Sequence, residues 1–201
     1  MEQYFTKNPS TKNEVYKFDW NIGTEKFYFY TSNSVFCKSG VDFGSMLLVE
    51  TFIKENNDFS GNILDLGCGY GPIGIMIAKF IKNSYVTMED VNERALELSD
   101  LNAKENKVQE RAKVINSSAF ENIHENYDAI VTNPPIRAGK EVIFSFYEGA
   151  YDHLNLGGML YVVIQKKQGA PSTKEKIMSL FGNCNVAGKK SGYFIFRATK
   201  F

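Results

Sequence analysis

Two spacings of apolar residues alternate along the chain from Gly61 onward. Continuous apolar runs, typical of buried strands, are followed by segments in which apolar residues recur every three or four positions, typical of amphipathic helices. Seven strands are predicted in this way, at 62–66, 85–90, 112–116, 127–132, 158–165, 183–189 and 192–199. Helices are predicted from the apolar faces at 73–81, 91–98 and 143–150, and from Pro171 and Gly182 as start and stop signals.

Strands that alternate with helices predict the fold class. Right-handed crossover connections between parallel strands give an α/β, doubly wound, mostly parallel seven-stranded sheet with helices on both faces. In such sheets the ligand binds at the carboxyl ends of the strands, where the direction of winding reverses. Residues that directly follow the strands are therefore the candidates for chemistry.

An aromatic alternation precedes this pattern. Tyr16, Phe18 and Trp20 alternate with polar residues, and after a turn near Gly23 a second aromatic run covers 27–30. The two runs predict an N-terminal β-hairpin extension. We expect it to occupy residues 1–35, before a main domain at 36–201. Its aromatic rings could stack on nucleic acid bases, but a packed hairpin core is the favoured interpretation.

Composition adds one asymmetry to this picture. The 201 residues are 43% apolar and carry no net charge, so the chain can bury a core and shows no global preference for a polyanion. Residues 157–201, however, contain eight Lys or Arg against the single acid Glu175, a net charge of +7 that leaves −7 for the rest. This basic segment favours a local contact with a polyanion; a solvated lysine-rich surface is the alternative.

The cysteines and the apolar runs exclude several classes of protein. Cys37, Cys68 and Cys184 are far apart in the sequence, which argues against a disulfide framework or a zinc site. No apolar run approaches the roughly 18 residues that span a bilayer, and the N-terminus lacks the pattern of a signal peptide. We expect a soluble, cytoplasmic protein with neither a metal nor a membrane partner.

A glycine-rich turn, DLGCGYGPIG at residues 65–74, follows the first strand of the predicted sheet. Glycines let the backbone turn tightly and approach a ligand closely, and the start of the next helix attracts a negative group. Asp90 ends the next strand, 19 residues beyond Gly71, where the hydroxyl pair of a ribose would lie. A purely structural turn is disfavoured because four glycines in eight residues destabilise a chain.

Two residues of this turn favour an amino-acid-bearing nucleoside over a dinucleotide. Asp65 would place a carboxylate beside the ligand, which suits a cationic amine better than a pyrophosphate. Pro72 removes a backbone donor from the start of the helix, where a phosphate would need it. S-adenosylmethionine (SAM) fits both ends of the predicted site.

A stiff turn, NPPI at residues 133–136, follows the strand at 127–132. Two consecutive prolines fix two φ angles and remove two backbone donors, so the turn presents an amide side chain and a free carbonyl. Such a pair of acceptors can hold a ligand, and which ligand depends on the rest of the chain.

With the glycine turn, Asp90 and NPPI in this order, the chain resembles the class I SAM-dependent methyltransferases. More narrowly, it resembles the small-methyltransferase-domain family typified by the RsmC-like ribosomal RNA guanine-N2 methyltransferases. FCKSGVDFGSMLL (36–48), NPPIRAGK (133–140) and VIQKKQGAPS (163–172) carry this likeness, which covers roughly residues 36–199. It implies a SAM-dependent methyltransferase that acts on ribosomal RNA or the small ribosomal subunit.

The resemblance also implies a role for each matching residue. The implied cofactor contacts are Gly67, Cys68, Gly69 and Gly71 at the methionine part, Asp65 at its amino group, Asp90 at the ribose, Ser118 at adenine, and Asp42 and Gly44 closing over the cofactor. Glu89 is the alternative to Asp90, because the sequence does not settle which residue ends the strand.

Substrate contacts are expected on the same edge of the sheet. The expected residues are Phe36, Lys38, Ile136, Arg137, Lys140, Lys166 and Lys167. Basic side chains there would contact RNA phosphates, although each one singly is as well explained as a solvated charge. Ile136 stands where related enzymes frequently have an aromatic residue, so the ring that stacks on the base must come from elsewhere, and Phe36 is the candidate.

The catalytic residues of this hypothesis are Asn133, Pro134 and Pro135. The Asn133 amide oxygen and the Pro134 carbonyl would each accept one N–H of an exocyclic amine and direct its lone pair at the sulfonium methyl. Alternatives are methylation of a protein glutamine or of adenine N6 in DNA, and an RNA-binding module with a vestigial cofactor pocket. The intact glycines argue against the last.

Overall fold

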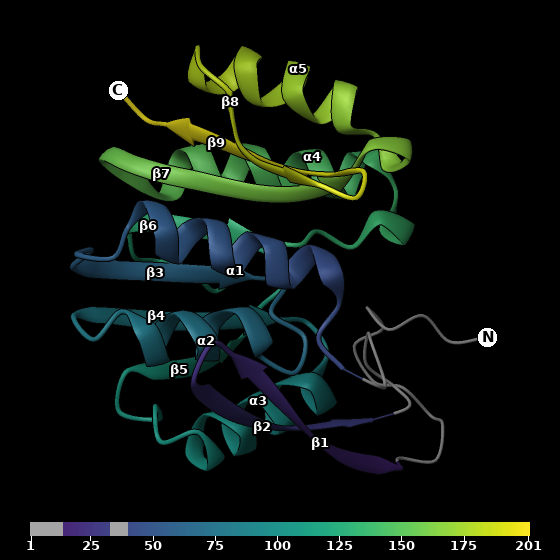
Figure 1. The fold of residues 1–201 in the computed structure, drawn as a ribbon. Helices are drawn as coiled ribbons and strands as arrows, with labels where there is room; N and C mark the ends of the chain where they lie inside the picture. The colour runs from purple at the N-terminus through teal and green to yellow at the C-terminus, as the bar shows by residue number, and fades with distance from the viewer. Residues whose placement is uncertain (1–13, 33–39) are drawn as a thin grey trace.

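A computed structural model describes residues 14–32 and 40–201 of the chain (Figure 1). The strands are β1 Val15–Ile22, β2 Glu25–Ser32, β3 Gly61–Leu66, β4 Ser84–Asp90, β5 Ala112–Asn116, β6 Tyr127–Thr132, β7 Leu154–Gln165, β8 Asn185–Lys190 and β9 Tyr193–Thr199. The helices are α1 Phe43–Glu55, α2 Pro72–Phe80, α3 Glu93–Glu105, α4 Lys140–His153 and α5 Ala170–Phe181, with two short 3-10 turns, η1 Ile136–Ala138 and η2 Lys166–Gln168.

Seven strands form one sheet in the order β5-β4-β3-β6-β7-β9-β8. The strands from β3 to β7 pair in parallel, and β9 runs antiparallel to both β7 and β8. The chain winds from β3 to β5 and then returns to place β6 on the other side of β3. The predicted doubly wound, mostly parallel sheet is therefore confirmed, and its winding reverses between β3 and β6.

Helices cover both faces of the sheet. Neighbouring residues of one strand alternate between two core clusters, as Ile63 and Leu64 show, so the clusters lie on opposite faces. The first cluster contains buried residues of α1, α2 and α3, and the second contains those of α4 and α5. Figure 1 shows α1 and α2 in front of the sheet and α4 behind it.

Local signals explain where the helices begin and end. Asn92 caps α3, since its side-chain oxygen accepts from the backbone N–H groups of Arg94 and Ala95 at 3.1 and 3.3 Å. Pro171 lies in the first turn of α5, and Gly182 ends that helix with a left-handed φ of 71°. These predicted signals are confirmed. Helix α1 was not predicted, and β7 begins four residues earlier than the apolar run indicated.

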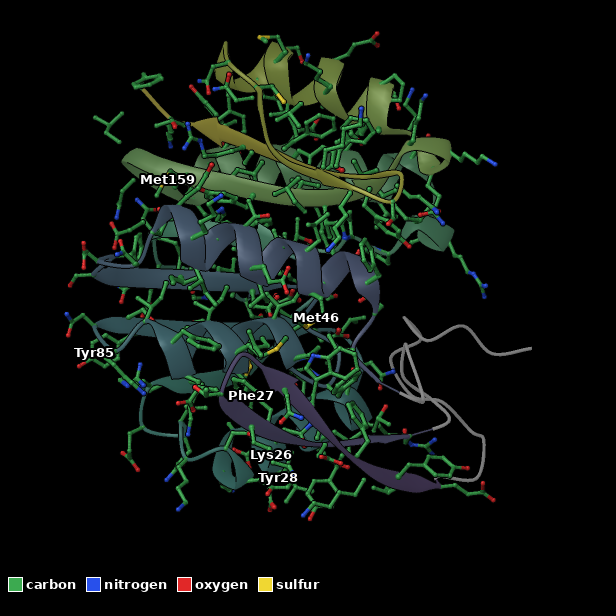
Figure 2. The ribbon with its side chains drawn as sticks, in the orientation of Figure 1. Lys26, Phe27, Tyr28, Met46, Tyr85 and Met159 are labelled. Atoms are coloured by element: carbon green, nitrogen blue, oxygen red, sulfur yellow. The ribbon has the colours of Figure 1, made fainter. Side chains whose placement is uncertain are left out.

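The N-terminal strands β1 and β2 form the predicted antiparallel hairpin. Phe27 is fully buried in the cluster that holds α1 and α2, whereas its neighbours Lys26 and Tyr28 are exposed (Figure 2). The indole N–H of Trp20 lies 3.0 Å from the sulfur of Met46, which attaches β1 to α1. Inward-facing rings of the hairpin thus form a packed core, as the favoured interpretation held. The boundary between residues 1–35 and 36–201 lies outside the described residues and stays a prediction.

Within residues 14–32 and 40–201, no helix is both long enough and apolar enough to cross a bilayer. The same residues contain no group of three or more His, Cys, Asp or Glu side chains placed to hold a metal ion.

Candidate functional site

The two sequence motifs emerge side by side at the point where the winding reverses. Leu66, the last residue of β3, pairs with Thr132, the last residue of β6, and the Thr132 hydroxyl donates to the Leu66 carbonyl at 2.8 Å. The glycine turn therefore starts next to the NPPI turn. In open α/β sheets, ligands bind at the carboxyl ends of the strands where the winding reverses, which is this position.

A cavity of about 580 Å³ lies between these turns. Its volume is in the range of small-molecule sites. The expected site residues that line it are Asp42, Gly67, Cys68, Gly69, Asp90, Ser118, Asn133, Pro134, Pro135, Ile136 and Arg137, together with the alternative acid Glu89. The structure thus brings the expected cofactor and catalytic residues to one cavity.

Other expected residues lie behind the cavity or at its rim. Gly44, Asp65 and Gly71 do not line it, and neither do Lys140, Lys166 and Lys167. Phe36 and Lys38 lie outside the described residues.

The glycines of the turn divide into two kinds. Gly69 has a φ of 59°, and a Cβ added there would meet nothing within 4 Å, so the cavity reaches the backbone itself. Gly71 and Gly74 serve packing instead, because a Cβ would lie 2.9 Å from Ser99 Oγ at Gly71 and 2.7 Å from Met88 at Gly74. Only part of the turn therefore faces a ligand.

Asp65 is fully buried and holds the turn in place. One carboxylate oxygen, Oδ2, accepts from the backbone N–H of Gly74 at 2.8 Å. The other, Oδ1, has no hydrogen-bond partner among the described residues. Burial, and to a smaller degree the nearby charge of Asp90, raises the pKa of Asp65 to about 7, against the opposing effect of the Gly74 hydrogen bond.

Glu89 and Asp90 end β4 and point to opposite faces of the sheet because they are adjacent in a strand. A carboxylate oxygen of Glu89 accepts from Gly67 N at 3.2 Å. Asp90 accepts from Gly69 N at 2.8 Å with Oδ2 and from Asn92 N at 2.8 Å with Oδ1. Burial raises the pKa of both carboxyl groups. Both acids therefore support the glycine turn and border the cavity, so the alternative between them stays open.

Helix α1 fixes the side chain of Asn133. The amide NH₂ group of Asn133 donates to Asp42 Oδ2 at 3.2 Å and to Ser45 Oγ at 3.0 Å. Asp42 is itself held, because its Oδ1 caps α1 through Gly44 N and Ser45 N at 2.9 and 3.2 Å. The Asn133 amide oxygen is consequently left as an acceptor, and no hydrogen bond between described residues uses it.

The prolines complete this acceptor pair. The Pro135 carbonyl accepts from Ala138 N at 2.9 Å as η1 begins, whereas no backbone hydrogen bond of the described residues uses the Pro134 carbonyl. Among the described residues, the Asn133 amide oxygen and the Pro134 carbonyl are thus both without a backbone donor, and both residues line the cavity beside the glycine turn.

Sequence reasoning missed about half of the residues that line this cavity, among them Ser45, Phe146 and Tyr193. Ser45 lies in the segment 36–48 that carries the family resemblance, three residues after Asp42, so the sequence could have indicated it as a site residue. Phe146 was predicted to be buried in a helix face, and its ring lies 3.4 Å from the position of a Cβ at Gly67. Tyr193 had no signal, since only the pairing of β9 with β7 brings it to this edge.

His153 has a structural role at the end of α4. The His153 ring stacks on Phe120 with 4.6 Å between ring centroids, and its nitrogens contact the carbonyls of Gly149 and Ile123 at 2.9 and 3.2 Å. Neither His153 nor His124 lines the cavity. The site therefore offers carboxylates, an amide and carbonyls rather than an imidazole base.

The expected basic residues are exposed around the cavity mouth. Arg137 in η1 lines the cavity, and Lys140 begins α4, where its ammonium lies 5.0 Å from the ring centroid of Phe144. Lys166 and Lys167 form η2 at the end of β7. These two turns emerge at the same edge of the sheet (Figure 1). Arg137 thus lines the cavity, and the three lysines lie outside its lining.

Comparison with known proteins gives the family context. Residues 26–197 match the family model described as Methyltransferase small domain. The chain is 44% identical over 201 residues to the uncharacterized protein YbxB of Bacillus subtilis (strain 168), covering 99% of this chain and 98% of that protein. It is 33% identical over 169 residues to ribosomal RNA small subunit methyltransferase C of Actinobacillus pleuropneumoniae serotype 7 (strain AP76), covering 82% of this chain and 50% of that protein.

A solved structure shows the same fold. The T. thermophilus 16S rRNA N2 methyltransferase RsmC, in complex with AdoMet and guanosine, superposes with a TM-score of 0.83 at 23% identity, covering 96% of this chain and 52% of that chain. This chain thus spans about half the length of these two methyltransferases.

Proposed function

The chain belongs to the methyltransferase small domain family, and on this premise we propose that it methylates the exocyclic N2 amine of a guanine in small-subunit ribosomal RNA. Its cofactor is SAM. The family supports the reaction, and the likeness to ribosomal RNA small subunit methyltransferase C supports the substrate.

The residues present fit SAM. Gly69 brings bare backbone to the cavity, and the acids Glu89 and Asp90 border it where ribose hydroxyls require acceptors. Asp65 does not itself line the cavity, but its Oδ1, directly before the glycine turn, is a buried acceptor without a partner among the described residues, and an acidic group behind the turn suits a ligand that carries an ammonium group. Gly67, Gly69 and Asp90 would hold the cofactor, with Ser118 toward its adenine.

One observation carries the proposal: the orientation of Asn133. Asp42 and Ser45 take up its amide hydrogens, so the amide oxygen is the group that remains for a substrate. Asn133 lines the same cavity as the glycine turn. An acceptor held in this way is suited to binding N–H groups, and an exocyclic amine supplies two of them.

The acceptor pair would make a weak nucleophile reactive. The lone pair of a guanine N2 amine is delocalised into the ring. When Asn133 Oδ1 and the Pro134 carbonyl each accept one N–H, the nitrogen is drawn toward tetrahedral geometry and its lone pair is aimed at the donor. SAM, when bound, supplies a methyl group on a positively charged sulfur that leaves as a neutral thioether. The nitrogen gives up one proton to solvent as its new bond forms, so no strong base is required.

The competing amine substrates are a protein glutamine and adenine N6 in DNA. An aromatic residue usually follows the prolines in enzymes of those two kinds, and Ile136 stands there in this chain. The exposed cations Arg137, Lys140, Lys166 and Lys167 at the cavity mouth favour a phosphate-bearing substrate over a glutamine. The guanine would have to be unpaired or flipped out of its helix to reach the turn.

Transfer of labelled methyl groups tests the proposal. The wild-type protein should label deproteinised 16S ribosomal RNA or isolated small subunits, and it should label neither duplex DNA nor a release factor. Mass spectrometry of ribosomal RNA from cells with and without the gene should then show one N2-methylguanine that depends on the gene. Labelling of DNA or of the release factor instead would contradict the substrate.

Asn133→Ala tests the role of the turn. We expect turnover to fall more than about tenfold, the equivalent of roughly 1.4 kcal/mol of barrier, while the affinity for SAM stays nearly unchanged. A smaller loss would show that Asn133 does not grip the amine. Equilibrium binding of SAM by calorimetry, measured beside single-turnover rates, separates the two effects.

A further inference from the structure

Two aromatic rings are in contact beside the cavity: Tyr193 lines it, and Phe43 lies outside its lining. Tyr193, the first residue of β9, lines the cavity. Its ring lies 5.4 Å, centroid to centroid, from the ring of Phe43, the first residue of α1, with an angle of 52° between the planes. Phe43 remains 41% exposed. Large rings in contact with each other and with solvent at a site entrance offer a surface for a flat ligand.

Contact with helix α1 fixes the position of the Tyr193 ring. A Cβ at Gly44 would lie 3.0 and 3.2 Å from two carbons of the Tyr193 ring. The absence of a side chain at Gly44 therefore lets the ring lie directly against the first turn of α1. The same turn contains Asp42 and Ser45, which hold the amide of Asn133. Tyr193 is consequently beside the acceptor pair rather than beside the acids of β4.

Sheet register gives the same placement independently. Tyr193 pairs with Gln165, the last residue of β7, and β7 is the neighbour of β6, after which the NPPI turn begins. The backbone N–H of Lys166 donates to the Gly192 carbonyl at 2.7 Å, which ties the tight turn before β9 to the basic turn η2. The ring is thus fixed between the catalytic turn and the rim.

Cations accompany these rings. The ammonium of Lys190 lies 6.0 Å from the ring centroid of Phe43, and Lys166 and Lys167 follow on η2. Aromatic faces beside lysines are the combination that binds single-stranded nucleic acid, where bases stack and phosphates pair with cations. Ile136 supplies no ring at the catalytic turn, so a stacking surface for the base has to come from another element.

We propose that Tyr193, supported by Phe43, is the surface on which the target purine stacks while Asn133 holds its amine. This inference rests on the proposed function and assigns its base-binding residue. It replaces Phe36, which lies outside the described residues, as the source of the ring. Gly44, expected to close over the cofactor, is assigned instead to making room for that ring.

Nucleoside binding tests the inference without requiring turnover. The probes are guanosine and inosine, which have the same ring system except that inosine lacks the N2 amine, titrated by NMR into protein saturated with S-adenosylhomocysteine. Tyr193→Ala should weaken both nucleosides alike, by about five- to a hundredfold, the range that loss of one stacking ring gives. Tyr193→Phe should bind both within about twofold of wild type. Asn133→Ala should remove only the preference for guanosine.

Methyl transfer supplies the second measurement. With deproteinised 16S ribosomal RNA, Tyr193→Ala should lower kcat/KM by a similar factor and leave the affinity for SAM unchanged, and Tyr193→Phe should restore kcat/KM. Tyr85→Ala is the matched control, since Tyr85 (labelled in Figure 2) is a 59% exposed ring at the amino end of β4, whereas the cavity lies at the carboxyl end of that strand. It should change neither quantity.

Three results would overturn the inference. Nucleoside binding by Tyr193→Ala that equals wild type would show that no base stacks there, and so would a wild type that binds neither nucleoside. A parallel loss of SAM affinity would make Tyr193 a cofactor contact. Failure of the proposed function looks different: the wild type would then label no RNA, whatever the nucleoside titrations show.

Discussion

The direction in which one amide faces decides what the NPPI turn can bind. If the oxygen of Asn133 faced α1, its NH₂ group would face the cavity and would repel the N–H groups of an amine. Asp42 prevents this because a carboxylate only accepts hydrogen bonds, and its position as the cap of α1 leaves it little freedom. The cap of α1 and the NPPI turn therefore depend on each other.

Asp42→Asn tests that dependence. Asparagine caps helices as well as aspartate does, so we expect the free energy of unfolding to change by less than about 0.5 kcal/mol. The new NH₂ group can face that of Asn133 and turn it around. The rate of methyl transfer should then fall about tenfold or more at unchanged SAM affinity. Ser179→Ala, on the exposed face of α5, is the control and should have the wild-type rate.

A loss of SAM affinity in Asp42→Asn would contradict this account. Asp42 would then be a cofactor residue, as the resemblance alone implied, and its bond to Asn133 would be incidental.

Asp65 should make the ligand-free protein less stable as the pH rises. Its pKa in the folded state, about 7, lies above the unfolded value near 3.8, so the folded state holds the proton more tightly. The contribution of Asp65 to stability is therefore complete below pH 3.8 and is lost as the pH rises through 7, with an upper limit of roughly 4 kcal/mol. Urea unfolding between pH 4 and 8 measures this decline.

Asp65→Asn is the comparison for that measurement. The variant should lose the part of the decline that Asp65 causes and keep the part caused by Glu89 and Asp90, whose pKa values burial also raises. If the two proteins lost stability with pH in parallel, the pKa of Asp65 would not be raised by folding, and this prediction would be wrong.

At the scale of elements, two asparagines attach the hairpin to the main domain. Asn106, at the end of α3, accepts from Tyr28 N at 3.0 Å and donates to the Tyr28 carbonyl at 2.7 Å. Asn102 makes the same pair of bonds with Tyr30 at 2.6 and 2.9 Å. The edge of β2 is thus paired by amide side chains in place of another strand. Asn102 also donates to the carbonyl of Tyr70, in the glycine turn, at 2.9 Å.

Changing each asparagine to alanine should therefore have different effects. Both variants leave backbone groups of β2 without partners, and we expect each to lose about 2 kcal/mol or more of unfolding free energy in urea titrations. Only Asn102→Ala also releases Tyr70, so only this variant should bind SAM more weakly at a temperature where both are folded. Equal SAM affinities in the two variants would show that the hairpin does not support the glycine turn.

The sequence predicted those elements whose apolar residues follow one clear spacing and end at a recognisable stop signal. The strand predicted at 127–132 is an apolar run followed by an asparagine and two prolines, and β6 has the same bounds. Helix α1 was missed because it carries buried residues on most of its surface, among them Gly44, Ser45 and Thr51, and so shows little apolar periodicity. Its cap, Asp42, was noticed only through the family resemblance.

The site was predictable to the same extent. The glycine turn and NPPI each follow a buried strand, and the reversal of winding between β3 and β6 places them together by rule. The orientation of Asn133 and the contact of Tyr193 with Gly44 depend on packing between segments about 90 and 150 residues apart, which no local pattern encodes.

The whole molecule separates its charge along the sheet. The basic segment at 157–201 forms most of β7, η2, α5, β8 and β9, which lie together at one end of the strand order (Figure 1). The remaining strands and helices carry the net negative charge. The cavity lies where the two halves meet, at β3 and β6. A polyanion would therefore be drawn to one side of the site, with the cofactor cavity on the other.

The salt dependence of RNA binding tests this arrangement. Lys166 and Lys167 are exposed on η2, and changing both to alanine should weaken binding and flatten the plot of log affinity against log salt concentration. Each lost phosphate contact reduces the slope by about 0.7 to 0.9, so the pair should reduce it by roughly 1.5. Lys54 and Lys82 form the control pair because they are exposed near the ends of α1 and α2, at the opposite edge of the sheet. Their double alanine variant should keep the wild-type slope, and an equal slope in the η2 variant would identify Lys166 and Lys167 as solvated surface charges.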